Sequence, residues 1–460
     1  MVKSFLQHWL PWIFGRTKEH ARAQPAAERR APGPLADGDD AQAIAELAAI
    51  GARRPLVSSA GAVVGFEFCI GDEVARQLKR QTDAHARTAR VEALLASAHV
   101  IVHTGRIGFA RMPAQWLVHA SGVDVGPGVL IGLESNAAVS VTPQVALDME
   151  QAIVALRARG AQVGWEPELA MALKPDFVLL RQGAKAMSAL LDAIPAWPAE
   201  LQGLPVLVTD ICNVEELEMA LYYGVTYACG VLDRDAEAVE SAAKHAVPPE
   251  VRRVSLLLNQ LVSGADTAVV VGQIKGDVGL SYRLLSRINS ASYAQLGSYA
   301  SVEQAVLLLG RYELYRWLSM LMVQFAGSRK ACSALQEMTL WRSRLLELVA
   351  MEQHEPAPDQ FFTLGLASML GPLLKISQAE VVDMLNLPVL ARQALLEHAG
   401  PWHAYLQMTK HIETRTLEQS AELVAQFGGT AGLMPLSDQA WHWAAEQTAH
   451  VDASDAGKAV

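Results

Sequence analysis

"VVGFEFCIGDE", residues 63–73, is an apolar segment with one carboxylate near its centre. The β-branched and aromatic residues around Glu67 favour a buried strand, and a charge inside such a strand is costly unless it has a partner. Glu67 is therefore a snorkelling side chain, a paired structural charge, or one ligand of an active site. The residues at the ends of the neighbouring strands decide among these three alternatives.

The segments around and after this strand alternate between strand and helix patterns. One helix begins after Thr142 as its N-cap and ends at Gly160, and another begins after Asn213 and ends at Gly224. Strands that alternate with helices predict a parallel sheet, and seven of them favour a βα barrel. We expect these strands at residues 62–70, 99–104, 127–133, 161–165, 176–180, 204–208 and 225–232.

The strand pattern stops near Pro248, and helical patterns replace it. Leu280 and Leu284 lie on one face of a predicted helix. Ser301 opens a capping box, and the helix that follows it should stop at Gly310. The second half of the chain is therefore expected to be all-helical.

The expected fold class is α/β plus all-α, with a TIM-like barrel before a helical domain. The N-terminal segment combines an amphipathic arm with a linker rich in alanine, proline, glycine and charge, which is typical of a flexible connection. The C-terminal segment becomes polar and is expected to fray. The boundaries are residues 1–45 for the arm and linker, 46–240 for the barrel, 248–425 for the helical domain and 426–460 for the polar tail.

The N-terminal arm has two interpretations. In residues 1–22 aromatic and leucine side chains precede basic ones, a pattern that suits an interfacial membrane anchor. Alternatively the arm docks on this protein's own surface or on a partner, and this interpretation is favoured because amphipathic arms commonly pack on protein. Pro11 interrupts a helix there, and no small-residue cleavage site follows it, so a signal peptide is not expected.

Composition excludes several classes of function. The net charge of −10 argues against a general nucleic-acid binder, because such a protein needs a basic binding face. The four cysteines have no CxxC spacing, so they are expected to be reduced and to form neither a disulfide framework nor a metal cluster. No apolar run reaches the roughly 20 residues that a membrane-spanning helix needs. A cytoplasmic protein is therefore expected.

Two segments carry a resemblance to a known family. "RRPLVSSAGAVVGFEFCIG" (residues 53–71) resembles the opening of an EAL domain, and "LPVLVTDICNVEELEMALYYGVTYACGVL" (residues 204–232) resembles a late strand–helix–strand unit of that family. The resemblance extends over residues 54–235 and concerns framework and spacing more than identities. It implies a TIM-like barrel and a site for cyclic di-GMP hydrolysis with divalent metals.

Few of the family's functional residues remain. Glu67 stands at the motif's glutamate, Glu134 at the second glutamate of the third-strand motif, and Glu166 at the first of two aspartates. His103 falls near an expected asparagine. The other family positions carry different chemistry: Gly71 for the nucleotide-binding arginine, Ile131 for a metal-binding glutamate, Leu179 for the catalytic lysine, Arg181 for an aspartate, Thr209 and Cys212 for two glutamates, and Cys229 for a glutamine.

These replacements predict a barrel without catalysis. Two hard cations need several oxygen ligands, and only Glu67 and Glu166 stand at matching ligand positions. Leu179 cannot act as an acid or a base, and Arg181 brings a positive charge where metals require a negative one. We therefore expect no bound metal and no cofactor, and Glu67 paired with Arg181 is a structural hypothesis for the buried carboxylate.

The helical half resembles a second family, the HDOD domain. The features are "DVGLSYRLLSRINSASY" (residues 277–293) followed by "SVEQAVLLLG" (residues 301–310), and the resemblance runs over residues 250–425. HDOD domains are related to metal-dependent HD hydrolases but typically lack the His-Asp pair, and Ser368 and Met369 occupy that place here. The remaining histidines are expected on the surface or between helices, namely His354, His398, His403 and His411.

Together the two resemblances imply a degenerate EAL domain fused to an HDOD domain. We expect a non-catalytic bacterial signal-transduction protein that acts through protein–protein contacts, with a protein of a cyclic-di-GMP network as partner, such as a kinase or a regulator. A homo-oligomer is a further possibility for the partner. The alternative from another class is a residual cyclic-di-GMP phosphodiesterase or a sensor that binds the nucleotide.

Overall fold

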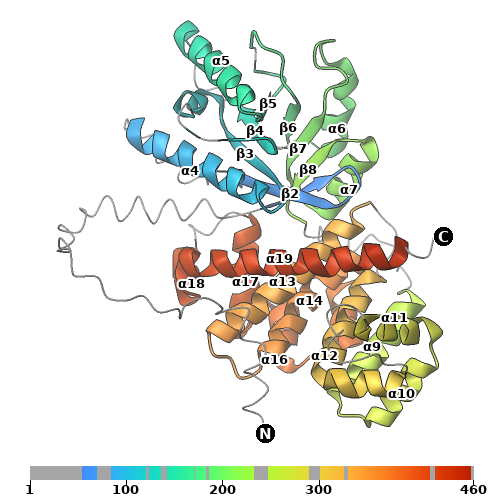
Figure 1. The fold of residues 1–460 in the computed structure, drawn as a ribbon. Helices are drawn as coiled ribbons and strands as arrows, with labels where there is room; N and C mark the ends of the chain where they lie inside the picture. The colour runs from blue at the N-terminus through green and yellow to red at the C-terminus, as the bar shows by residue number, and fades with distance from the viewer. Residues whose placement is uncertain are drawn as a thin grey trace, which may run out of the picture. The chain divides into compact units, whose positions relative to one another are not determined.

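Eight strands close into a barrel in sequence order (Figure 1). β1 runs antiparallel to both of its neighbours, β2 and β8, and every other neighbouring pair is parallel. The strands are β1 (Arg54–Ser58), β2 (Val63–Cys69), β3 (Ile107–Pro113), β4 (Val129–Glu134), β5 (Gln162–Trp165), β6 (Val178–Arg181), β7 (Val206–Ile211) and β8 (Tyr227–Gly230). The computed structural model describes residues 54–69, 84–120, 123, 125–135, 142–169, 171–182, 186–232, 247–289, 301–325, 330–414 and 420–456.

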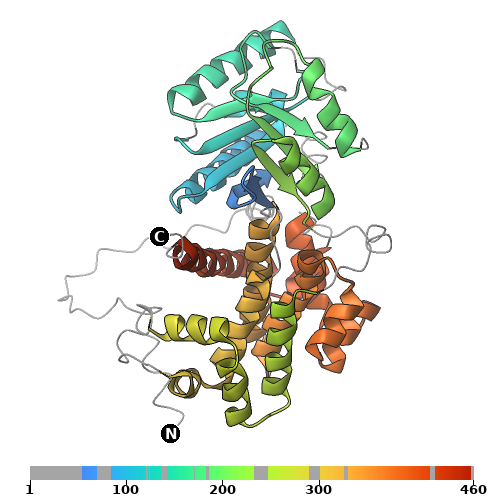
Figure 2. The same cartoon turned by 90° about the vertical axis from the view of Figure 1, so that its right-hand side faces the viewer.

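Helices cover the outside of this barrel (Figure 1, Figure 2). The two caps expected from the sequence are confirmed: Thr142 accepts a hydrogen bond from Val145 N, and Asn213 accepts one from Glu216 N. Gly160 and Gly224 both adopt left-handed backbone angles at the helix ends. The helical elements are α4 (Ala84–Val102), η2 (Ala114–His119), α5 (Pro143–Ala158), α6 (Met187–Asp192), η3 (Ile194–Ala196) and α7 (Val214–Tyr223).

One of the seven expected strands is wrong, and two strands were missed. Residues 99–104 lie at the end of α4 and in the turn after it, where the run Val100–Val102 mimics a strand although Ala98 and Ile101 pack as one helix face. β1 and β3 were overlooked, because β1 is short with a proline and β3 carries an arginine among its apolar residues. The other six strands are confirmed, and so is the barrel.

The barrel interior holds a hydrophobic cluster separate from the packing between strands and helices. These side chains alternate with outward ones along each strand, as the two-residue period of a strand requires. Gly132 leaves space for this cluster, since a Cβ there would come within 2.8 Å of the Phe109 ring and 3.2 Å of the Leu179 side chain. The cluster consists of Leu56, Phe109, Leu130, Phe177, Leu179, Leu207 and Cys229.

The second half of the described chain is helical, as expected. Ser301 caps α12 by accepting from Gln304 N. The stop expected at Gly310 is confirmed: its backbone angles, φ 69° and ψ 174°, are not helical, so one helix ends there and a second begins after the kink within the range of α12. The elements are α9 (Pro249–Val262), α10 (Thr267–Lys275), α11 (Val278–Ile288), α12 (Val302–Gln324), α13 (Cys332–Glu352), α14 (Pro358–Leu374), α15 (Gln378–Leu385), α16 (Val389–Arg392), η5 (Gln393–Glu397, a π-helical turn), α17 (His403–Thr414), α18 (Ala421–Gln426) and α19 (Gly429–Ala456).

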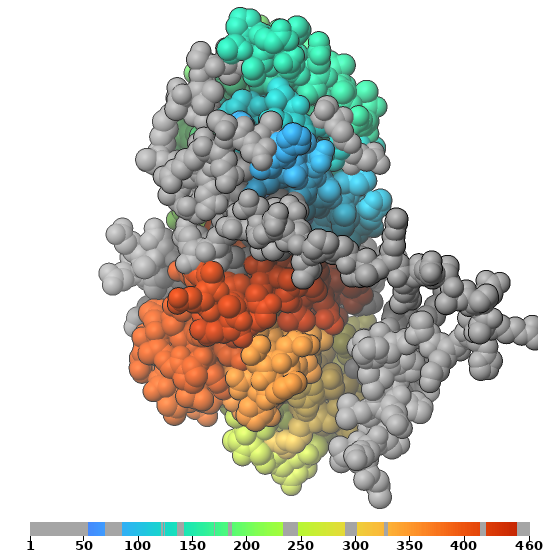
Figure 3. All heavy atoms as spheres, turned by 90° about the vertical axis from the view of Figure 1, so that its left-hand side faces the viewer, coloured from blue at the N-terminus to red at the C-terminus, as the bar shows by residue number. Residues whose placement is uncertain are grey.

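Within the segment expected as a fraying polar tail, residues 426–460, the range Gly429–Ala456 instead forms α19. Leu433, Ala440, Trp441 and Ala444 are buried along one face of this helix, and the Trp441 ring stacks on Trp341 of α13 with centroids 4.9 Å apart. Figure 3 shows these C-terminal residues, in red, packed on the lighter orange helices. A narrow buried stripe is enough to hold the helix, which is why a largely polar sequence hid it.

Helices α13 and α19 also cover the outer face of the β1–β2 hairpin. Phe66 points outward from β2 and meets Trp441 edge to face at 4.9 Å. Gly61, in the turn between the strands, accepts a hydrogen bond at 2.9 Å from Ala334 N in the first turn of α13. The N-cap of α13, Ala331, has no side-chain cap, so this barrel carbonyl satisfies one of the helix's free amides.

Three further expectations concern the N-terminal segment, the cysteines and membrane-spanning helices. The N-terminal arm, its linker and Gly71 lie outside the described residues. No disulfide joins any of the four cysteines, and Cys69 and Cys229 are buried in β2 and β8. None of the described helices has an apolar stretch long enough to cross a membrane.

Candidate functional site

Charged side chains gather at the barrel end where the parallel strands finish. β1 contributes its first residue, because its antiparallel direction places Arg54 opposite Glu67 near the end of β2. Arg111 lies at the matching level of β3, paired in register with Cys69. Every second residue of a strand faces inward, so the same end of the barrel receives Glu134 from β4, Glu166 after β5, Arg181 from β6 and Asp210 from β7. We call these seven residues the mouth cluster.

Arg111 is the centre of the mouth cluster. Its Nε lies 2.9 Å from Glu67 Oε1, and its Nη1 lies 2.8 Å from Glu134 Oε1. Both terminal nitrogens donate to Asp210, at 2.6 and 3.0 Å. Its side chain is only 6% exposed. Burial by itself would lower the pKa of Arg111, but the three carboxylates outweigh it and raise that pKa well above the usual value, so the guanidinium is permanently charged.

Arg54 is the second cation of the cluster. Its Nη1 donates to Asp210 Oδ1 at 2.8 Å and lies 3.7 Å from Glu67 Oε2. Its Nε donates to the backbone carbonyl of Glu413 in α17 at 3.3 Å. Burial favours the neutral acid at Asp210, yet Arg111 and Arg54 together lower its pKa below the usual value. Asp210 is therefore held as an anion by two arginines.

Arg181 is the third cation and lies nearer the solvent, with 43% of its side chain exposed. Its Nε is 3.2 Å from Glu166 Oε1, and its Nη1 is 3.9 Å from Glu134 Oε1. Glu166 also accepts hydrogen bonds from the backbone N and the Oγ of Ser135. Burial raises the pKa of Glu134 more than Arg111 and Arg181 lower it, so that pKa lies above its usual value.

The expected site residues are only partly brought together. Glu67, Glu134, Glu166 and Arg181 do meet at the mouth. The expected pairing of Glu67 with Arg181 is wrong, because Arg111 and Arg54 hold Glu67 while Arg181 holds Glu166. A fully buried carboxylate needs a fully buried partner, and Arg181 lies too close to the solvent for that.

The remaining predicted positions lie elsewhere in the barrel. Leu179 and Cys229 belong to the apolar interior below the mouth, and burial next to Glu67 raises the pKa of the Cys229 thiol. Thr209 is buried and accepts from Arg111 at 3.3 Å. Ile131 points out of the barrel into the core shared with the helices, and Cys212 is exposed beyond β7. His103 lies in the turn after α4 and not on a strand.

Sequence reasoning missed Arg54, Arg111 and Asp210. The signal for Arg111 was present, since in "IGFARMP" it shares a strand face with Phe109, whose side chain fills the barrel interior. Asp210 sits next to Thr209 but has a left-handed φ of 59°, which breaks the alternation by which the sequence places side chains. Arg54 reaches the mouth because β1 runs antiparallel to β2. No local sequence pattern predicts that strand direction.

Arginine side chains contact the carboxylates of the mouth cluster. It contains four carboxylates, the ligands that hard cations prefer, but three of them contact the Arg111 guanidinium. Among the residues that the structure describes, no group of three or more His, Cys, Asp or Glu side chains is placed to hold a metal ion. The cations that contact these carboxylates are the side chains of Arg54, Arg111 and Arg181.

The residues singled out in the helical part are Ser368, Met369 and four histidines, and all of them lie among the described residues. Ser368 donates to the Gly365 carbonyl and accepts from Arg342, while Met369 is fully buried. The rings of His398 and His403 lie 5.5 Å apart. His354 lies in the turn after α13, and His411 contacts Ser420 at 2.8 Å.

Comparisons with known proteins give one family model and several relatives. Residues 246–388 match the family model of the HDOD domain. The chain is 32% identical over 157 residues to the uncharacterized protein YuxH of Bacillus subtilis, covering 34% of this chain and 38% of that protein. It is 27% identical over 200 residues to the cyclic di-GMP phosphodiesterase CdgJ of Vibrio cholerae, covering 43% and 46%. The matched part spans less than half the length of either relative.

Solved structures similar to this chain include EAL domains. An EAL domain protein from Listeria monocytogenes matches with a TM-score of 0.29 and 11% identity, covering 42% of this chain and 92% of that chain. The Bacillus subtilis YkuI protein, which has an EAL domain, matches with a TM-score of 0.28 and 13% identity, covering 48% and 70%.

Proposed function

We propose that this chain, an EAL–HDOD protein, is a non-catalytic signal-transduction protein that acts through protein contacts of its two domains. The sequence relationship to a cyclic di-GMP phosphodiesterase connects it with cyclic-di-GMP signalling. The main support for the absence of catalysis is the position of Arg111, whose guanidinium lies within 3 Å of Glu67, Glu134 and Asp210.

Arg111 competes directly with metal binding. A divalent cation at the mouth would need the oxygen atoms of carboxylates that the guanidinium now contacts. Displacing Arg111 would leave a buried charge without a partner, and breaking a buried ion pair in this way costs about 3–5 kcal/mol. Metal-dependent hydrolysis would have to overcome that cost before any chemistry began.

The residues that the structure describes at the mouth are poorly suited to transfer a proton to or from a reacting water. Leu179, at the place where the family resemblance puts a lysine, is fully buried in the apolar interior. Asp210 is held ionised by two arginines, and a carboxylate so stabilised is a weak base. Burial raises the pKa of Glu134, but its carboxylate already contacts Arg111 and is not free to act on a water.

The test is calorimetry and hydrolysis with cyclic di-GMP, using the full chain with magnesium or manganese. We expect no hydrolysis above the protein-free rate and no binding at micromolar concentration. A phosphodiesterase known to be active serves as the positive control in the same buffer. Micromolar binding or hydrolysis by this chain would overturn the proposal.

The second candidate is a cyclic-di-GMP phosphodiesterase or sensor, which the relationship to CdgJ favours. If cyclic di-GMP binds the mouth, Glu67→Gln should change its affinity, because Glu67 is completely buried there. Glu168→Gln, an exposed carboxylate just beyond β5, is the matched control. An equal effect of both variants would place the binding outside the mouth.

The proposed mode of action requires a protein partner, which includes a second copy of this chain. Light scattering of the purified full chain across a concentration series measures self-association directly. Chemical cross-linking of the full chain in its bacterial host, followed by mass spectrometry, detects other partners. A chain that is monomeric and forms no cross-links to protein would contradict action through protein contacts.

A further inference from the structure

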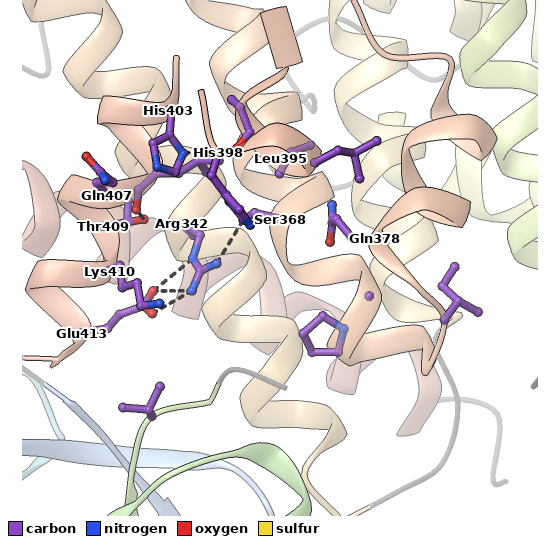
Figure 4. A pocket seen from close by; sticks show the side chains of 17 residues that line it. Arg342, Ser368, Gln378, Leu395, His398, His403, Gln407, Thr409, Lys410 and Glu413 are labelled. Carbon is purple, nitrogen blue, oxygen red and sulfur yellow. Dashed lines mark hydrogen bonds and ion pairs between the residues drawn. The ribbon is translucent and has the colours of Figure 1, made fainter. Parts of the chain in front are cut away.

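A cavity of about 470 Å³ opens in the helical part, lined by residues of α14, α17 and the η5 turn (Figure 4). This volume is in the range of small-molecule sites. Its wall has an apolar portion, formed by Pro372, Leu395 and Leu406 among others, and a polar portion on the side of α17. An apolar wall with a few converging polar groups is the usual composition of a ligand site.

The polar side of the cavity carries an excess of positive charge. Arg342 is neutralised by Glu413, since its Nη2 lies 2.7 Å from each carboxylate oxygen, and its Nη1 donates to Ser368 at 3.1 Å. Lys410, one turn before Glu413 on α17, also lines the cavity. Within the described part of the chain, no carboxylate forms an ion pair with Lys410. The lining is therefore cationic by one charge before any histidine is protonated.

Two histidines, His398 and His403, also line the cavity, and Figure 4 shows them next to each other; His403 lies about two turns before Lys410 on α17. His403 Nδ1 is 3.2 Å from the Ala394 carbonyl, and a carbonyl only accepts, so Nδ1 carries the hydrogen and Nε2 is left for other partners. In the doubly protonated ring both nitrogens donate, so Nε2 is the atom of His403 that would then face an anion.

The backbone around His398 is unusual in a way that suits a ligand site. η5 is a π-helical turn, a feature that is frequent at functional sites. His398 follows it with a φ of 52°, which is uncommon for a residue other than glycine. Such backbone conformations are strained and cluster at ligand contacts. Here the turn brings His398 to the cavity rim, beside the imidazole of His403.

We propose that this cavity binds a small organic anion with an apolar body. Lys410 and His403 hold its phosphate or carboxylate group, and Leu395 and Leu406 pack against its apolar part. The site is distinct from the mouth cluster, since none of the seven mouth residues lines it. It gives the helical domain an input of its own, a small metabolite carrying one anionic group.

The test uses benzyl phosphate and phenylacetate as anionic probes and benzyl alcohol as the neutral match. Isothermal calorimetry with the full chain should show saturable binding of at least one anion, while benzyl alcohol binds at least ten-fold more weakly. The two anions distinguish a phosphate site from a carboxylate site. Saturable binding of neither anion, or equal binding of benzyl alcohol, would overturn the proposal.

Matched variants locate the binding. Lys410→Met keeps the aliphatic stem and should weaken anion binding about ten-fold or more, because a charge-assisted contact is lost. His403→Gln, which retains a donor for the Ala394 carbonyl, should also weaken it. Lys174→Met, at an exposed position of the barrel, should leave it unchanged. Anion binding unaffected by both cavity variants would refute the assignment, and thermal melting of each variant confirms that it is folded.

Discussion

Arg111 and Glu67 form a charge pair inside the protein, with 6% and 0% of their side chains exposed. At the residue scale such a pair adds little net stability, because desolvation offsets most of the attraction. The same physics makes the removal of one partner costly, since the other charge stays buried. The two arginines that reach Glu67 therefore determine whether the barrel mouth tolerates that carboxylate.

Arg111→Met should destabilise the protein by about 3–5 kcal/mol, because it leaves Glu67 buried without its nearest cation. In a Glu67→Gln background the same change should cost much less. Arg181→Leu is the control, and because Arg181 is largely exposed we expect a loss below about 1 kcal/mol. Urea unfolding of the four variants measures these differences. An equal loss from Arg111→Met in both backgrounds would show that Glu67 does not depend on it.

Asp210 predicts a pH dependence of stability. Arg111 and Arg54 lower its folded pKa despite burial, so the folded state binds this proton more weakly than the unfolded chain. The stabilisation from Asp210 is fully present above the unfolded pKa of about 3.9 and is lost as pH falls through the lowered folded value.

The free energies of unfolding of the wild type and Asp210→Asn should therefore differ by a constant amount near neutral pH. The difference should shrink only below about pH 4, where Asp210 starts to bind its proton in the unfolded chain. Chemical unfolding of both proteins across pH 3–8 measures it. A difference that already declines between pH 7 and pH 5 would mean that the pKa of Asp210 is raised and not lowered.

At the scale of elements, the sequence predicts best where a segment has its own caps. α5 and α7 begin and end where Thr142, Gly160, Asn213 and Gly224 indicate. β3 and α19 were missed because tertiary packing decides them: an inward arginine makes β3 look polar, and a stripe of few buried residues holds α19. The candidate site follows the same division, since the strand that supplies Glu67 was predicted and its partners were not.

α19 gives an element-scale prediction. Trp441→Ala should destabilise the protein by about 3–5 kcal/mol, because it removes a buried ring that contacts both Phe66 and Trp341. His442→Ala, on the exposed side of the same helix, should have little effect. Thermal or urea unfolding compares the two. Equal, small effects would indicate that residues 426–460 behave as the polar tail that composition suggests.

The contact between the β1–β2 turn and the start of α13 gives a second prediction at the scale of elements. Gly61→Ala should be strongly destabilising, because its Cβ would lie 1.5 Å from the Lys330 carbonyl oxygen and its φ is +82°. Gly203→Ala is a matched control, since Gly203 has φ +77° with no atom within 4 Å of the added Cβ, and it should cost only the backbone term of about 1–2 kcal/mol. Similar losses of unfolding free energy in both variants would show that the turn has room to move away from α13.

At the scale of the whole described chain from Arg54 onward, three side chains connect the cavity with the mouth cluster. Arg342 contacts Ser368 at the cavity and holds the Glu413 carboxylate. The Glu413 backbone carbonyl accepts from Arg54, which in turn holds Asp210. A shift of α17 at Glu413 would therefore change contacts both at the cavity and at the mouth cluster. The barrel and the helical part are physically connected in this way.

This connection predicts coupling between Arg342 and Arg54, although they do not pair with each other. Arg342→Gln loosens Glu413 and thereby the carbonyl that Arg54 uses, so the two single changes in unfolding free energy should not add. We expect an interaction energy of about 0.5–3 kcal/mol from the double-mutant cycle. Arg157→Gln, whose partner is Asp176, replaces Arg54→Gln in a control cycle that should be additive. Additive changes in unfolding free energy in both cycles would mean that the cavity and the barrel mouth are energetically independent. Glu413 of α17 would then not couple them.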